Sequence, residues 1–284
     1  MGNSLINSQN DAELKAKYNP EGSQLRQIQY RELDILIEFD RICRIHNIDY
    51  WLDSGTLIGA VRHGGFIPWD DDIDICVLKK DWKKLEKAMK ESVGEDYEYS
   101  GYGKKSKLPH PRLYDKYASV KRKLKGRDVI ADESLWLDVL LMEPGSLITK
   151  RVIENTYGKC LRRVWNYMDD GRFKHSIALI AYPFTFVFKL IISGLCYAFH
   201  SNTLVHCYGN ALYSIRKKSE IFPLSEIEFE GRMFKAPYDV DAYLKRIYGN
   251  YMEIPSSDKI EDHCFLEYKV DTQPREDCMT FHKI

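Results

Sequence analysis

The sequence has no excess of charge of one sign: Lys plus Arg and Asp plus Glu each number 42 among 284 residues. A chain without a basic surplus has no overall attraction for nucleic acid, so we expect no nucleic-acid partner. Its seven cysteines are scattered and include no C-x-x-C pair, which excludes a disulfide framework and a cysteine-pair zinc site. Residues 1–17 lack the apolar stretch of a signal peptide. These absences predict a reducing, cytoplasmic setting.

What is present is the composition of a soluble globular protein, with 44% hydrophobic and 30% charged residues. A chain of this length buries a sizeable core. We expect a loose polar tail at 1–22, a core at 23–150, a helical insertion at 151–215, and a C-terminal part at 216–284 that packs on the core.

Alternation of hydrophobic and polar residues predicts a mixture of helices and strands, an α+β fold. Apolar residues recur at helical spacing over 24–46, 81–90 and 240–248, and residues 57–61 start a further helix. Strands are expected at 48–52, 73–78 and 136–142, and a hairpin at 226–236.

Residues 176–199 form a long apolar segment in which Lys189 is the only charged residue. Its length permits a membrane span, but a central lysine costs about 2.5–3.5 kcal/mol there on insertion scales. Pro183 and Gly194 are also expected to interrupt the helix. We therefore favour a buried or interfacial helical pair, which allows a peripheral contact with the inner face of a membrane.

Four carboxylates stand within five positions, at Asp70, Asp71, Asp72 and Asp74, beside an apolar strand. Because side chains alternate along a strand, Asp72 and Asp74 share one face, about 6 to 7 Å apart at the backbone. Like charges at this spacing repel, and a cation between them relieves the repulsion. Hard oxygen ligands favour Mg²⁺ or Mn²⁺ over zinc. We predict that Asp72 and Asp74 bind metal, and interpret Asp70 and Asp71 as a solvated acidic turn.

A second apolar strand, at 136–142, is interrupted by one charged residue, Asp138. A lone carboxylate in such a strand is costly unless it is paired or bound to metal, so Asp138 is the candidate third ligand. Glu133 and Glu143 fall near strand ends, where solvation is the expected explanation.

The residues Ser54, Gly55 and Thr56 form a turn that follows one strand and opens a helix. Backbone N–H groups at such a turn, together with two hydroxyls, suit a phosphate, although a plain helix start is the alternative. Arg62 and Lys116 are candidate cationic contacts to phosphate, although exposed basic residues are more often merely solvated.

The stretch from Ser54 to Ile75, Ser-Gly-Thr-Leu-Ile-Gly-Ala-Val-Arg-His-Gly-Gly-Phe-Ile-Pro-Trp-Asp-Asp-Asp-Ile-Asp-Ile, closely resembles the signature of the LicD family, which includes the fukutin-related proteins. Residues 136–143 are similar to the family's second acidic strand, and residues 243–252 with His263 are similar to its C-terminal block. The chain departs from the family pattern at Gly64, Leu141, Glu143 and Cys264.

This resemblance implies a polymerase β-type nucleotidyltransferase core, a small mixed sheet flanked by helices, with a helical insertion. It implies transfer of phosphocholine or a similar phospho-group from a CDP-linked donor such as CDP-choline. The acceptor would be a sugar hydroxyl of a cell-surface or lipid-linked glycan, as in lipopolysaccharide biosynthesis. Asp72 and Asp74 would hold Mg²⁺ or Mn²⁺ against the donor diphosphate, and Asp138 would complete the site or accept the hydroxyl proton.

Three alternatives remain open at this point. A nucleotidyltransferase would attack the α-phosphate of its donor, and a metal-dependent glycosyltransferase would use a D-x-D pair to bind a sugar nucleotide. A non-enzymatic module would contact a membrane through 176–199 and carry a degenerate site.

Overall fold

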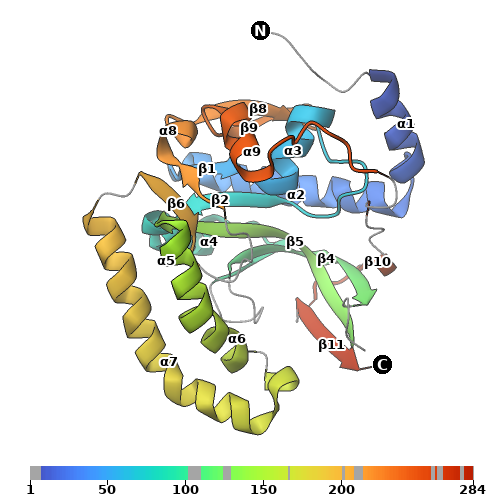
Figure 1. Cartoon of the computed structure of the whole chain (residues 1–284). Coiled ribbons are helices and arrows are strands. Elements are labelled where there is room, and N and C mark those ends of the chain that lie inside the picture. Colours follow the sequence, from blue (N-terminus) through green and yellow to red (C-terminus); the bar gives the residue numbers. More distant parts are fainter. Residues whose placement is uncertain are drawn as a thin grey trace.

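One mixed β-sheet organises the chain, and helices pack around it (Figure 1). The computed structural model describes residues 8–101, 110–123, 129–165, 167–199, 202–207, 214–256, 260, 265–275 and 278–283. Within these residues, nine strands form the sheet: β1 (Tyr50–Leu52), β2 (Asp74–Leu78), β3 (Tyr97–Ser100), β4 (Arg112–Lys123), β5 (Val129–Pro144), β6 (Thr203–His206), β7 (Arg216–Lys217), β10 (Phe265–Val270) and β11 (Met279–Lys283). The expected arrangement of a mixed sheet flanked by helices is confirmed.

The long strand β5 lies at the centre of this sheet. The order is β1-β2-β5-β4-β10, and β11 and β6 also pair with β5. The pair β2–β5 is parallel and places Asp74 opposite Asp138, while β4 runs antiparallel to β5 and places Arg112 opposite Asp138. Residues opposite one another on neighbouring strands point to the same face, so the topology brings together side chains that are far apart in sequence.

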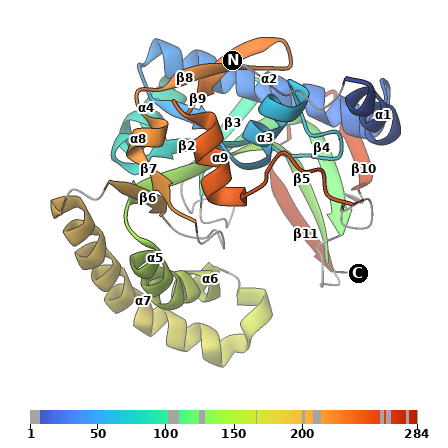
Figure 2. The same cartoon turned by 45° about the horizontal axis from the view of Figure 1, so that its top comes forward.

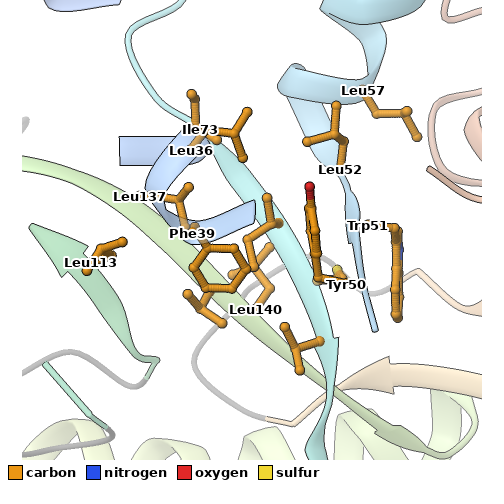
Figure 3. Packing of buried hydrophobic residues seen from close by; sticks show 14 of the residues in the cluster. Leu36, Phe39, Tyr50, Trp51, Leu52, Leu57, Ile73, Leu113, Leu137 and Leu140 are labelled. Atoms are coloured by element: carbon orange, nitrogen blue, oxygen red, sulfur yellow. The ribbon is translucent and has the colours of Figure 1, made fainter. Parts of the chain in front are cut away.

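Helix α2 (Gln24–Ile45) covers one face of the sheet and forms the core with it. Ser23 caps the helix by accepting a hydrogen bond from the backbone N–H of Arg26. The buried stripe includes Leu36 and Phe39, which Figure 3 shows beside Ile73, just before β2, and Leu137 of β5. This is the amphipathic helix that the sequence predicted for 24–46.

Two shorter helices frame the acidic strand. Helix α3 (Ser54–His63) ends at Gly64, whose φ of 64° is a left-handed conformation that glycine adopts without steric cost. After β2, a 3₁₀ turn η1 (Lys79–Asp81) leads into α4 (Trp82–Ser92). Both helices were predicted from the sequence, although α3 is longer than the expected 57–61.

The expectation of a loose N-terminal tail is wrong for residues 8–18, which form helix α1 (Ser8–Tyr18). This helix is held to the core by Asp11, which bonds His63 Nδ1, and by Lys15, whose Nζ lies 3.2 Å from the carbonyl oxygen of His63. Polar contacts with the core therefore hold the helix in place. The tail has no apolar stripe from which the helix could be predicted.

The expected helical pair at 176–199 is also wrong. The segment belongs to one continuous helix, α7 (Tyr167–Ala198), with Pro183 inside it. It follows α5 (Leu147–Ile153), a π-helical turn η2 (Glu154–Gly158) and α6 (Lys159–Trp165). Figures 1 and 2 show these helices extending away from the sheet, with α7 on the outer side. The chain then returns through β6, which pairs with β5.

The C-terminal part contains the predicted hairpin and helix, together with strands that were not predicted. Strands β8 (Ser225–Phe229) and β9 (Arg232–Ala236) are joined by a turn at Glu230 and Gly231, both with positive φ. Helices α8 (Lys218–Ile221) and α9 (Val240–Tyr248) flank this hairpin in sequence. Strands β10 and β11 then join the main sheet. His263 and Cys264 lie outside the described residues.

Candidate active site

Three charged side chains form a row across the middle of the sheet. Asp138 of β5 stands opposite Asp74 of β2 on one side and opposite Arg112 of β4 on the other. Asp72 lies in the loop just before β2, because the strand begins at Asp74 and not at the predicted residue 73. The structure thus brings Asp72, Asp74 and Asp138 to one region.

Hydrogen bonds from three side chains hold the carboxylate of Asp138. His110 Nε2 lies 2.8 Å from Oδ1, Arg112 donates to both oxygens, and Trp136 Nε1 lies 3.2 Å from Oδ2. Burial alone would raise the pKa of Asp138, but the charges and hydrogen bonds of Arg112 and His110 outweigh it and hold the pKa well below its usual range. Asp138 is therefore fixed in position and ionised.

The pKa values of Asp72 and Asp74 are shifted in the opposite direction from that of Asp138. Burial raises the pKa of each well above its usual value, and the nearby aspartates raise both pKa values further. Among the charged neighbours, Asp138 raises the pKa of Asp74 most, and Asp70 raises the pKa of Asp72 most. A cluster of carboxylates that repel one another is an environment in which a cation binds favourably.

A fourth carboxyl group faces the same region from helix α2. The side chain of Glu32 is fully buried, and neither of its oxygens has a hydrogen-bond partner among the described residues. Burial, with added repulsion from Asp71 and Asp72, raises its pKa well above the usual value. A buried carboxyl without a partner is costly, and it adds to the affinity of this region for a proton or a cation.

The donor set fits a hard divalent cation in its chemistry. Asp72 and Asp74 offer carboxylate oxygens, the type of ligand that Mg²⁺ and Mn²⁺ prefer. In the described part of the chain, no three His, Cys, Asp or Glu side chains already stand close enough to enclose an ion. Asp138 is turned toward Arg112 and His110, so Asp72 and Asp74 are the pair best placed to hold a cation.

The predicted phosphate turn lies at the start of α3, next to the carboxylates. Ser54 is buried and has a positive φ of 49°, a strained conformation for a residue with a side chain. The Thr56 hydroxyl accepts a hydrogen bond of 2.9 Å from the backbone N–H of Asp74, so it orients β2. At Gly55, an added Cβ would overlap the carboxylate of Asp70. A phosphate therefore reaches this helix N-terminus only if Asp70 turns away.

The two predicted cationic contacts lie in different places. Arg62 is buried, donates from Nη1 to the carbonyl oxygen of Tyr251 at 3.2 Å, and leaves Nε and Nη2 unpartnered among the described residues. Burial lowers its pKa, although the nearby Asp70 opposes this shift. Lys116 lies four residues beyond Arg112 on β4, at an irregularity in the strand pairing, where its backbone bonds Asp96 and Arg275. The described hydrogen bonds and ion pairs do not join Lys116 to the carboxylates.

Three acidic residues that we expected to be solvated are buried. Asp71 is buried, and Gln29 of α2 donates hydrogen bonds to the carbonyl oxygens of Ile67 and Asp70 in the loop before it. Glu133 bonds Arg112 and Arg122, and Glu143 bonds Lys79 at 2.7 Å. Solvation was the wrong explanation for each. Basic side chains on neighbouring elements neutralise Glu133 and Glu143.

Sequence reasoning missed Glu32, His110 and Arg112. Arg112 is a charge at the start of a strand whose next residues are buried, the same signal that identified Asp138. Glu32 lies on the buried stripe of α2, where a charge is unusual. The position of His110 has no comparable signal, because it depends on how β4 and β5 pair.

A buried polar network adjoins this row at the end of β1. Arg216 Nη2 lies 2.8 Å from Asp53 Oδ2, and the Tyr243 hydroxyl donates to Asp53 Oδ1 at 2.7 Å. Burial would raise the pKa of Asp53, but the charges of Arg216 and His206 and the Tyr243 hydrogen bond lower it to about 2. The backbone N–H of Asp53 also bonds the carbonyl oxygen of Asp74, so the network fixes the start of the acidic strand.

Sequence comparison connects this geometry with known proteins. Residues 47–122 match the family described as LicD/FKTN/FKRP, nucleotidyltransferase domain. It is 26% identical over 263 residues to the lipopolysaccharide cholinephosphotransferase LicD of Haemophilus influenzae, covering 86% of this chain and 97% of that protein.

Shorter matches fall on two further proteins. The human ribitol 5-phosphate transferase FKRP is 36% identical over 55 residues, which is 19% of this chain and 11% of that protein. The uncharacterized protein RP689 of Rickettsia prowazekii is 52% identical over 44 residues, 16% of each chain. The first match extends over nearly the whole relative, whereas the others are confined to short segments.

Proposed function

We propose that this chain is a phosphotransferase of the LicD type, built on a nucleotidyltransferase-like core. It would transfer phosphocholine or a similar phospho-group from a CDP-linked donor to a sugar hydroxyl of a cell-surface or lipid-linked glycan. The observation that carries this proposal is the pairing of Asp74 with Asp138 across the parallel strands β2 and β5, with Asp72 beside them. The similarity to LicD over 97% of that protein gives the reaction class.

In this proposal Asp72 and Asp74 hold Mg²⁺ or Mn²⁺. When bound, the ion would neutralise the negative charge on the transferred phosphoryl group and on the departing CMP. The fit rests on two observations: both carboxyls are oxygen donors, and both repel their neighbours when no cation is present.

Asp138 has a different role from the other two aspartates. Its oxygens already accept hydrogen bonds from His110, Arg112 and Trp136, and its pKa is low. A carboxylate so engaged is a weak proton acceptor. We therefore assign Asp138 to fixing charge and geometry beside Asp74, with Arg112 as its positioning residue, in preference to a general base.

Two residues at opposite ends of α3 are the best placed to meet donor phosphate. Gly55 lies in the first turn, at the positive end of the helix dipole, and a phosphate can approach its backbone once the Asp70 carboxylate turns away. Arg62 keeps two guanidinium N–H groups available, although its burial requires the phosphate to penetrate toward Trp69 and Tyr251. Lys116 is not part of this arrangement.

The proposal predicts which product leaves. Incubation with CDP-choline, Mg²⁺ and a glycan acceptor is expected to release CMP, detected by ion-exchange chromatography, and to transfer phosphocholine to the glycan. CDP-ethanolamine, CDP-ribitol and CDP-glycerol, assayed in parallel, define the donor headgroup. Transfer of CMP itself to the acceptor would contradict the proposal and favour nucleotidyl transfer.

A further inference from the structure

Helix α7 exposes apolar side chains where a soluble protein would bury them. Ile180, Phe184, Val187 and Ile191 are 71%, 74%, 54% and 58% exposed. Their spacing of four, three and four residues places them on one stripe of the helix. Residues on the opposite side, among them Lys189 and Ser193, are buried. The helix thus packs through one narrow face, which also includes the partly buried Tyr182 and Ile192, and leaves much of its apolar surface exposed.

The one charge in the apolar segment is neutralised inside the protein. Lys189 is 2% exposed, and its Nζ lies 3.2 Å from Glu143 Oε2, which also bonds Lys79. Ser193 adds a hydrogen bond to the same carboxylate. The exposed surface of residues 176–199 therefore carries no charge, which removes the main obstacle to contact with lipid.

The helices next to α7 indicate whether it spans a membrane or lies in the plane of its surface. Among the described residues, Lys174–Ala198 is the one helix long and apolar enough to cross a membrane by length and composition. Yet α7 packs beside η2 and α6 (Figure 2). Helix α6 bears the exposed residues Lys159 and Arg163. A spanning α7 would draw these charges into hydrocarbon, whereas a helix lying in the plane of the surface leaves them among headgroups.

Charge in this part of the chain fits an anionic surface. Of the basic residues in 147–199, Lys150 and Lys189 are buried in ion pairs with Glu154 and Glu143. The exposed ones among the described residues are Arg151, Lys159, Arg163 and Lys174. At the C-terminal end of α7, a cavity of about 440 Å³ is lined by Tyr197 and by three charged residues, Lys80, Lys218 and Asp49. Basic residues beside an apolar helix face are the pattern that binds anionic lipids.

We propose that α7 lies in the plane of an anionic lipid bilayer, with the Ile180–Phe184–Ile191 stripe among the acyl chains. This inference goes beyond the transfer reaction and does not depend on it, because membrane binding involves neither the donor nor the acceptor of that reaction. It assigns to the helical segment 147–199 the role of holding the enzyme on a membrane surface.

The test is sedimentation of the full chain with vesicles. Wild-type protein is expected to cosediment with vesicles of phosphatidylglycerol and phosphatidylcholine in equal parts, and less with phosphatidylcholine alone. The triple variant Ile180→Gln, Phe184→Gln, Ile191→Gln is expected to lose about tenfold or more in partition coefficient. The control Met233→Gln, Leu266→Gln, Val270→Gln removes three apolar residues elsewhere that are 50–59% exposed, and it is expected to bind as wild type.

Three results would overturn the proposal. The first is that wild type stays in the supernatant with anionic vesicles, and the second is that the α7 triple variant, shown folded by circular dichroism, binds as well as wild type. The third is that alkaline carbonate fails to release the bound protein, which would mean that α7 spans the bilayer. Light scattering without lipid tests whether a second copy of the chain covers this face instead. If wild type is a dimer, the triple variant is a monomer and neither binds vesicles, the face is a dimer interface and the proposal is wrong.

Discussion

Asn in place of Asp74 is expected to reduce phosphocholine transfer by about 10³-fold or more, because the variant loses a negatively charged oxygen ligand at the reacting phosphate. The fold should be retained. Asp74 lies among Asp138, Asp53 and Asp70, all of which raise its pKa, so removing its charge relieves repulsion. The melting temperature should therefore stay the same or rise, while the rate of CMP release falls.

A matched control separates this effect from a general effect of lost charge. Asp34 is exposed on helix α2, and Asp34→Asn is expected to leave transfer and melting temperature unchanged. Near-normal turnover by Asp74→Asn with the preferred donor would remove the assignment of this carboxylate to catalysis. A large loss of stability in Asp74→Asn would show that its charge serves the fold.

The largest loss of stability is expected from Arg216→Met. Arg216 and Asp53 are both fully buried and lie 2.8 Å apart, so the variant leaves a buried carboxylate without its cation. Breaking such a pair from one side costs about 3–5 kcal/mol. We expect a correspondingly lower denaturation midpoint in urea, with Tyr243 remaining as the main hydrogen-bond donor to Asp53.

The double variant Asp53→Asn, Arg216→Met tests the cause of that loss. With both charges removed, no unpaired ion remains in the interior, and most of the stability should return. Recovery would identify the ion pair as the source of the loss. A double variant as unstable as Arg216→Met would contradict this explanation and assign the loss to packing around the Arg216 side chain.

The elements that sequence reasoning predicted well are those with a strong local pattern. The buried stripe of α2 repeats at helical spacing, and the ranges 73–78 and 136–142, which were predicted as strands, are apolar runs that each contain one charge. Asp138 was predicted as a third ligand beside Asp72 and Asp74 because a single charge interrupts its apolar strand, and the parallel register of β2 and β5 gives the physical basis for its place opposite Asp74.

The parts that were missed depend on contacts between distant segments. Helix α1 forms where Asp11 meets His63, and the network of Asp53 joins residues more than 150 positions apart. The burial of Glu143 depends on Lys189, which arrives from α7. Such pairings follow from how the strands and helices assemble, and no local periodicity in the sequence encodes them.

Binding of Mn²⁺ by isothermal titration calorimetry tests the central claim most directly, because it measures the proposed role of the acidic pair without any substrate. Wild type and Asp34→Asn are expected to bind the ion with the same affinity, and the double variant Asp72→Asn, Asp74→Asn is expected to show no saturable binding in the same range. Equal Mn²⁺ affinity in wild type and the double variant would contradict the claim that these two carboxylates hold the metal.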